Sequence, residues 1–177
     1  MFSLWYKTKT YTMSTISAFQ QELEREALTT RKMLSVIPTD KFGWKPHEKS
    51  MTIKALATHI ADIFTWFGMV INTSELDFAK DPYQPEEVNT TAELMTLFEK
   101  NLVQGRTALA NAKDEQLTNN WIMRNGAEIW VNDNKHDVLR MCFGQIIHHR
   151  AQMGVFLRLL NVPIPGSYGP SADEMGL

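Results

Sequence analysis

Apolar residues recur at intervals of three and four along four stretches of the chain, and this spacing predicts four amphipathic helices. In each stretch the apolar side chains fall on one helix face, as expected for helices that bury one side in a shared core. The predicted helices span residues 17–37, 53–71, 90–109 and 135–160. The pattern contains no internal repeat and no low-complexity segment.

Cap and turn residues predict where these helices begin and end. Ser17 with Gln20, and Thr90 with Glu93, have the spacing of capping boxes, in which two side chains satisfy the free amides of a helix start. Pro38 ends the first helix, because proline cannot continue one. The connections between helices are long enough to indicate a bundle in which the chain crosses between non-adjacent helices.

The pattern changes just before the fourth helix. Strand-forming residues at 121–124 and 127–130 flank Asn125-Gly126, a pair typical of the type I′ turn of a β-hairpin. The tail from residue 163 to 177 holds three prolines and three glycines, which predicts no regular structure. The sequence therefore predicts an all-α fold, a four-helix bundle with crossover connections and a small β-hairpin before the last long helix.

Composition limits the classes of function. The chain has 177 residues, of which 44% are hydrophobic and 21% charged, which suits one globular domain. Met13-Ser14 indicates an alternative start, so we expect an N-terminal extension at 1–13 and a single bundle domain at 14–177. A net charge of −2 argues against nucleic acid and membrane as partners. The lone Cys142 cannot form an intrachain disulfide, which favours a reducing cytoplasm.

Three polar side chains fall on the apolar faces of the second and fourth helices. Gln145 and His149 are four residues apart and therefore share a helix face, and His59 lies on the apolar face of the second helix. A buried polar group left without a partner costs about 1–3 kcal/mol. A divalent cation bound by His59, Gln145 and His149 would satisfy all three, since bundles build metal sites from inward side chains. Hydrogen bonds within the core are the alternative, and the spacing alone leaves both open.

Four neighbouring residues are further candidates. Asp62 follows His59 by three residues, which suits a ligand, a residue that orients a ligand, a base, or an ordinary solvated aspartate. Trp66 lies two turns after His59 and therefore on the same helix face. His148 points about 100° away from His149 around the helix, so we expect it at an interface, in the surroundings of the site, or exposed to solvent. We expect Arg150 to pair with a carboxylate or cap a loop. A set of aromatic residues would line a substrate cleft or pack in the core: Trp44, Phe64, Trp66, Phe67, Trp121, Trp130 and Tyr168.

The chain also resembles a known family. The segment HHRAQ at 148–152, the run at 156–165 that follows it, and a histidine in the middle of the second helix are similar to the DinB superfamily of DinB/YfiT-like metal-binding bundles. The similarity extends over roughly residues 14–171.

The resemblance implies a site made by one histidine of the second helix and an HxxxH pair on the last, which together hold zinc or nickel. His59 and His149 match this pattern, whereas Gln145 replaces the first histidine of the pair. A glutamine amide oxygen is a weaker and harder ligand than imidazole and carries no charge, so we expect lower affinity and blurred metal selectivity. The site would then be empty in some preparations.

The resemblance implies a metal-dependent enzyme of the thiol S-transferase/isomerase or hydrolase type, acting on a small molecule. A low-molecular-weight thiol would be the cosubstrate, because a metal-bound thiol loses its proton and becomes a nucleophile. One alternative is a non-catalytic stress-associated bundle that acts through dimerisation or partner binding, and another is a small-molecule binding module without metal. We expect a homodimer, and the sequence assigns no catalytic residue.

Overall fold

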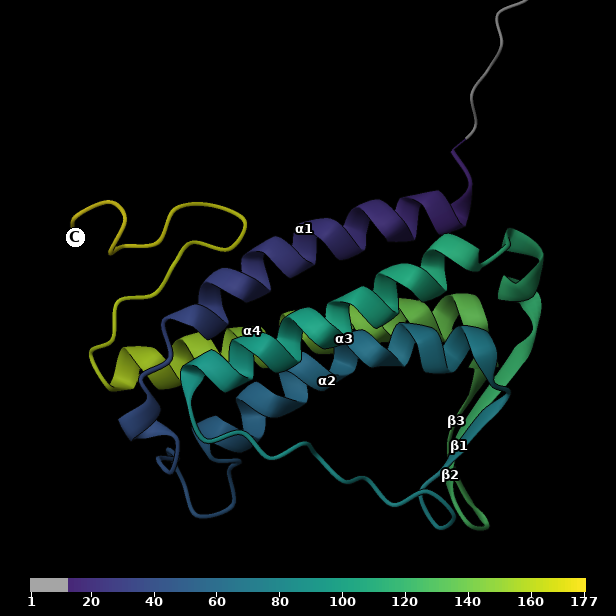
Figure 1. Ribbon diagram of the computed structural model, residues 1–177, viewed down its shortest axis with the longest axis horizontal. Helices are drawn as coiled ribbons and strands as arrows, with labels where there is room; N and C mark the ends of the chain where they lie inside the picture. The colour runs from purple at the N-terminus through teal and green to yellow at the C-terminus, as the bar shows by residue number, and fades with distance from the viewer. Residues whose placement is uncertain (1–12) are drawn as a thin grey trace, which may run out of the picture.

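The structure is a computed structural model that describes residues 13–177, so the predicted N-terminal extension lies outside the described residues except for Met13. Four long helices lie side by side along the length of the molecule (Figure 1). They are α1 (Thr15–Ser35), α2 (Ile53–Asn72), α3 (Thr91–Asn111) and α4 (Lys135–Leu159), with short 3-10 helices at Thr39–Lys41 and Asp114–Thr118. Within residues 13–177, none of the helices is both long and apolar enough to cross a bilayer.

The contacts between helices show that the bundle has crossover connections, as predicted. α2 packs against α3 and α4, and α1 packs against the same two helices, so α1 and α2 lie diagonally opposite each other. The connections from α1 to α2 and from α3 to α4 therefore both cross the bundle. α2 and α3 are neighbours that run in the same direction, so segment 73–90 must return along the length of the bundle to join them (Figure 1).

A small sheet lies at one end of the bundle and differs from the predicted hairpin in two respects, its number of strands and the type of its turn. β2 (Asn120–Asn125) and β3 (Glu128–Asn134) form the hairpin, and β1 (Glu75–Asp77) adds a third strand that is parallel to β2. The hairpin loop is Gly126-Ala127, and Asn125 pairs with Glu128 within the strands. Only Gly126 of the loop has a positive φ, 60°, which is typical of a type II′ turn and not of the predicted type I′ turn.

The predicted start of the first helix is wrong by one turn. α1 begins at Thr15, with Ser14 as the cap whose hydroxyl accepts the backbone N–H of Ser17. The carboxylate of Asp114 accepts the N–H of Thr15 at 3.1 Å, which satisfies a further free amide of the helix start. Gln20, predicted to act in the cap, lies inside the helix.

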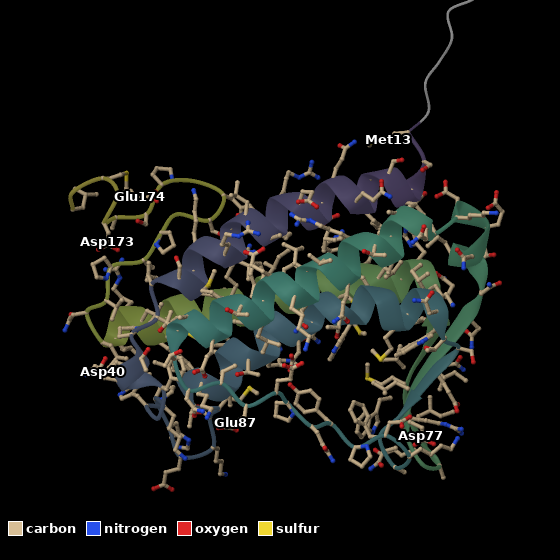
Figure 2. The ribbon with its side chains drawn as sticks, viewed as in Figure 1. Met13, Asp40, Asp77, Glu87, Asp173 and Glu174 are labelled. Carbon is tan, nitrogen blue, oxygen red and sulfur yellow. The ribbon has the colours of Figure 1, made fainter. Side chains whose placement is uncertain are left out.

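The other helix ends lie within two residues of the predicted positions, and α1 ends at Ser35, before Pro38. Thr90 caps α3 and accepts the backbone N–H of Glu93, as predicted, while the carboxylate of Glu93 accepts the N–H of Asn89. The tail after α4 forms turns and bends without helix or strand. Figure 2 shows Asp173 and Glu174 on this tail, at the opposite end of the bundle from Asp77 in the sheet. The sheet and the tail therefore lie at opposite ends of the helical bundle.

Candidate metal centre between the second and fourth helices

His59 and His149 face each other across the contact between α2 and α4. Their ring centroids are 4.7 Å apart, with the ring planes at 77°. Both side chains are half-buried, so one edge of the pair remains open to a ligand. The structure therefore brings together the two imidazoles that the sequence places on inward helix faces.

Burial keeps both imidazoles neutral. Desolvation, and second the nearby His149, lower the pKa of His59 from 6.5 to about 4. Desolvation also lowers the pKa of His149, and His148 adds to this effect while the hydrogen bond with Gln152 opposes it. At neutral pH both rings thus keep a free nitrogen lone pair, the form in which histidine binds a metal ion.

One polar contact sets the orientation of the His149 ring. Its Nδ1 lies 3.1 Å from Oε1 of Gln152, one turn later on α4. When Nδ1 carries the proton and donates it to this amide oxygen, Nε2 is left with the lone pair. Gln152 therefore fixes the tautomer that leaves a nitrogen available for coordination.

The third donor of the predicted set is Gln145. It is half-buried on α4 and precedes His149 by one turn, so helix geometry places both on the same face. Across residues 13–177, no group of three or more His, Cys, Asp or Glu side chains is arranged to hold a metal ion. An ion at the histidine pair would therefore depend on the Gln145 amide oxygen and on solvent or substrate for its remaining ligands.

Two aromatic side chains, one of them bound to a carboxylate, pack beside His59. Trp66 meets the His59 ring edge-on at 5.7 Å, and Tyr83, brought in by segment 73–90, does so at 6.2 Å. The Tyr83 hydroxyl donates to Oδ2 of Asp62 at 2.5 Å. Asp62 is therefore linked to the site indirectly: it binds Tyr83, and the Tyr83 ring contacts His59.

The Asp62 carboxyl has a second donor, the buried Asn101 of α3. Its Nδ2 lies 3.3 Å from Oδ1 of Asp62 and 3.2 Å from the carbonyl oxygen of Ala61. Burial raises the pKa of Asp62, against the lowering effect of the bonds from Tyr83 and Asn101. Burial and the Asp62 carboxylate also raise the pKa of Tyr83, so the phenol stays protonated as a donor.

Sequence reasoning missed Tyr83 and Asn101 for different reasons. Tyr83 belongs to a connection without periodicity, so nothing in the local pattern places it near α2. Asn101 lies on the buried face of α3, beside Phe98 and Leu102, and a polar residue in an apolar stripe is a signal that could have identified it.

Arg150 is buried and belongs to a different network. Its Nη1 lies 2.6 Å from Oε2 of Glu26 on α1, so Arg150 pairs with a carboxylate, one of the two roles expected for it, although the sequence does not indicate which carboxylate. Its Nη2 donates to the Ser167 hydroxyl at 3.3 Å and to the Tyr168 hydroxyl at 3.0 Å. The Tyr168 hydroxyl in turn donates to Oε1 of Glu26 at 3.0 Å. Arg150 therefore holds the tail against α1 and α4.

The remaining candidates are dispersed. His148 is exposed, with its ring 4.9 Å from that of His149. Cys142 is fully buried, and burial raises the pKa of its thiol to about 12, as suits an inert core residue. A single cleft lined by all seven aromatic residues does not form, because the rings other than Trp66 have separate surroundings. Phe64, Phe67 and Trp121 lie in the core, Trp44 packs on Phe156, Trp130 on Phe78, and Tyr168 on Arg150.

Comparisons with known proteins place the chain among similar bundles. The sequence profile described as the DinB family matches residues 8–176. The protein YrdA of Bacillus subtilis (strain 168) is 24% identical over 160 residues, which cover 90% of this chain and 92% of that protein.

Two solved structures share the fold. A DinB-like protein of Bacillus subtilis, YjoA, has a TM-score of 0.67 at 20% identity, over 85% of this chain and 96% of that chain. The mycothiol-dependent maleylpyruvate isomerase has a TM-score of 0.55 at 12% identity, over 78% of this chain and 60% of that chain. At these identities the likeness concerns the fold.

Proposed function

The chain belongs to the DinB family, and from this premise we propose that it is a divalent-metal-dependent enzyme of the thiol S-transferase/isomerase or hydrolase type. The observation that carries the proposal is the approach of two half-buried, neutral imidazoles, those of His59 and His149, across α2 and α4. The likeness in fold to a mycothiol-dependent isomerase is the reason for choosing a low-molecular-weight thiol as cosubstrate. We place this chemistry in a reducing cytoplasm, where such thiols persist.

The residues present suit zinc or nickel. His59 and His149 would supply two imidazole nitrogens and Gln145 an amide oxygen, with the remaining positions open to substrate. The ion would lower the pKa of a bound thiol or water. Around it, Gln152 holds the His149 ring, and Tyr83 presents a protonated phenol whose orientation is fixed by Asp62. Because Gln145 stands where a three-histidine site would have a histidine, we expect this site to bind metal more weakly than such a site does.

A thiol-transfer assay tests this proposal. Protein purified without a polyhistidine tag and reloaded with zinc or nickel should accelerate the reaction of glutathione with 1-chloro-2,4-dinitrobenzene. Chelator should remove the acceleration, and His59→Ala should not regain it on reloading. A reaction rate that chelator leaves unchanged would contradict a metal-dependent function.

One surface feature favours the homodimer. Val155 and Leu159 are each 59% exposed and lie four residues apart on the outer face of α4, in line with Ile147 and Ala151. An apolar stripe along one helix suits pairing with the same stripe of a second copy. We expect Val155→Glu to convert a dimer to a monomer in light scattering after gel filtration. Equal masses for the variant and the unchanged protein would exclude this stripe as the interface.

A further inference from the structure

A cavity of about 370 Å³ lies between α2, α3 and segment 73–90. It is near the histidine pair, but neither His59 nor His149 lines it. Trp66 and Tyr83 are common to the cavity wall and to the surroundings of His59. The volume falls within the range of small-molecule sites, about 300–1,000 Å³. It is therefore large enough for a small organic ligand.

Contacts within the protein hold two of the aromatic rings that line this cavity, Phe78 and Tyr83. Phe78 follows β1 directly, and its backbone N–H donates to the carbonyl of Arg124 in β2 at 2.9 Å. The ring of Phe78 is backed by Trp130, at a centroid distance of 5.3 Å. Tyr83 is held by its hydrogen bond to Asp62. Together with Trp66, which contacts the His59 ring at a centroid distance of 5.7 Å, they give the cavity three aromatic rings in its lining.

The charged residues that line the cavity are all acidic. Asp62, Asp81 and Glu86 contribute carboxylates, whereas no Lys, Arg or His is among the lining residues that the structure describes. Lys100, outside the lining, pairs with Glu86 at 2.5 Å and also acts electrostatically on Asp62, whose pKa it lowers. Within residues 13–177, neither Asp62 nor Asp81 forms an ion pair of its own, so the carboxylates around the cavity outnumber the nearby cation. Tyr83 and Asn101 both donate hydrogen bonds to Asp62, so it acts as an acceptor, as a carboxylate does.

Aromatic rings and carboxylates together attract one class of ligand. Ring faces carry negative electrostatic potential and bind alkylammonium groups, and tryptophan does so best. A neutral ligand would gain the apolar contact alone, and an anion would be repelled. From the three aromatic rings and the excess of carboxylates around this cavity, we infer that it binds a small organic cation of the quaternary ammonium type. The inference goes beyond the proposed function, because it requires no metal ion at the histidines.

Choline and its neutral isostere 3,3-dimethylbutan-1-ol provide a matched test. They have nearly the same shape and differ in the charge of the central atom, so their difference in affinity reports the cation. The full chain, treated with chelator and kept at low ionic strength, should bind choline roughly tenfold more tightly in calorimetry. The chelator separates this result from the metal proposal.

Variants locate the binding. Trp66→Leu and Asp62→Asn should each weaken choline binding several-fold, while Asp133→Asn, which removes the same charge from an exposed position on β3, should leave it unchanged. Circular dichroism would confirm that each variant is folded. Equal affinity for choline and the neutral isostere in the unchanged protein would overturn the inference, as would equal losses in Asp62→Asn and Asp133→Asn.

Discussion

At the scale of single residues, the buried pair of Arg150 and Glu26 shows how an ionic group serves the fold. Their side chains are 2% and 7% exposed. Burying two charges is costly, and the cost is offset only when each has several partners. Here Thr30, Ser167 and Tyr168 complete the hydrogen bonding of the guanidinium. The pair therefore joins α1, α4 and the tail.

Arg150→Met would leave the Glu26 carboxylate buried without a cation. We expect a loss of about 3–5 kcal/mol in the free energy of unfolding, measured in urea. Adding Glu26→Gln should recover much of this loss, because the unpaired charge is then gone. Arg158→Met is the control, since its partner Asp173 is more exposed, and it should change stability little. Similar losses for the two arginine variants would refute this role of burial.

At the scale of elements, the contact of α2 with α3 depends on a glycine. A Cβ atom at Gly105 would lie 2.5 Å from the carbonyl oxygen of Phe64, which is closer than such atoms pack. The two helices therefore approach at a point where only glycine fits. This close approach also brings Asn101 of α3 within reach of Asp62 on α2.

Replacing Gly105 by alanine tests this contact. Alanine favours helix, yet the clash should outweigh that gain, and we expect a net loss of about 1–3 kcal/mol in thermal or urea unfolding. Gly144→Ala on α4 is the matched control, because nothing lies within 4 Å of its Cβ position. It should stabilise the protein by about 0.5–1 kcal/mol. Stabilisation by both substitutions would show that the helices can separate at no cost.

The sheet depends on Asp77, which predicts a pH dependence. Its carboxylate accepts the backbone N–H groups of Gly126 and Ala79, and these bonds, with Arg124 and Lys80 nearby, lower its pKa below 3.8. A carboxylate with a lowered pKa stabilises the fold above about pH 4 and loses this effect as the pH falls through the folded-state pKa.

The comparison of the unchanged protein with Asp77→Asn isolates this effect. We expect the unchanged protein to melt at a higher temperature than the variant at pH 6, and the difference to shrink as the pH falls below 3.8. Other carboxylates titrate equally in both proteins and cancel. A difference in melting temperature that stays constant from pH 6 to pH 3 would contradict the assignment.

At the scale of the whole molecule, the parts that the sequence predicts are those with local causes. Helix periodicity predicts the four helices and the inward faces of His59 and His149. The strand β1 has three residues and owes its existence to pairing with β2, more than forty residues later, so no local pattern indicates it. Tyr83 reaches His59 only because α2 and α3 run in the same direction, which is a property of the assembled bundle.

The central claim is that His59 and His149 hold one divalent ion. Metal analysis of tag-free protein, reloaded with zinc and then desalted, tests it most directly. We predict about one zinc ion per chain in the unchanged protein and in His148→Ala, and almost none in His149→Ala. Equal zinc content in His149→Ala and the unchanged protein would contradict the claim.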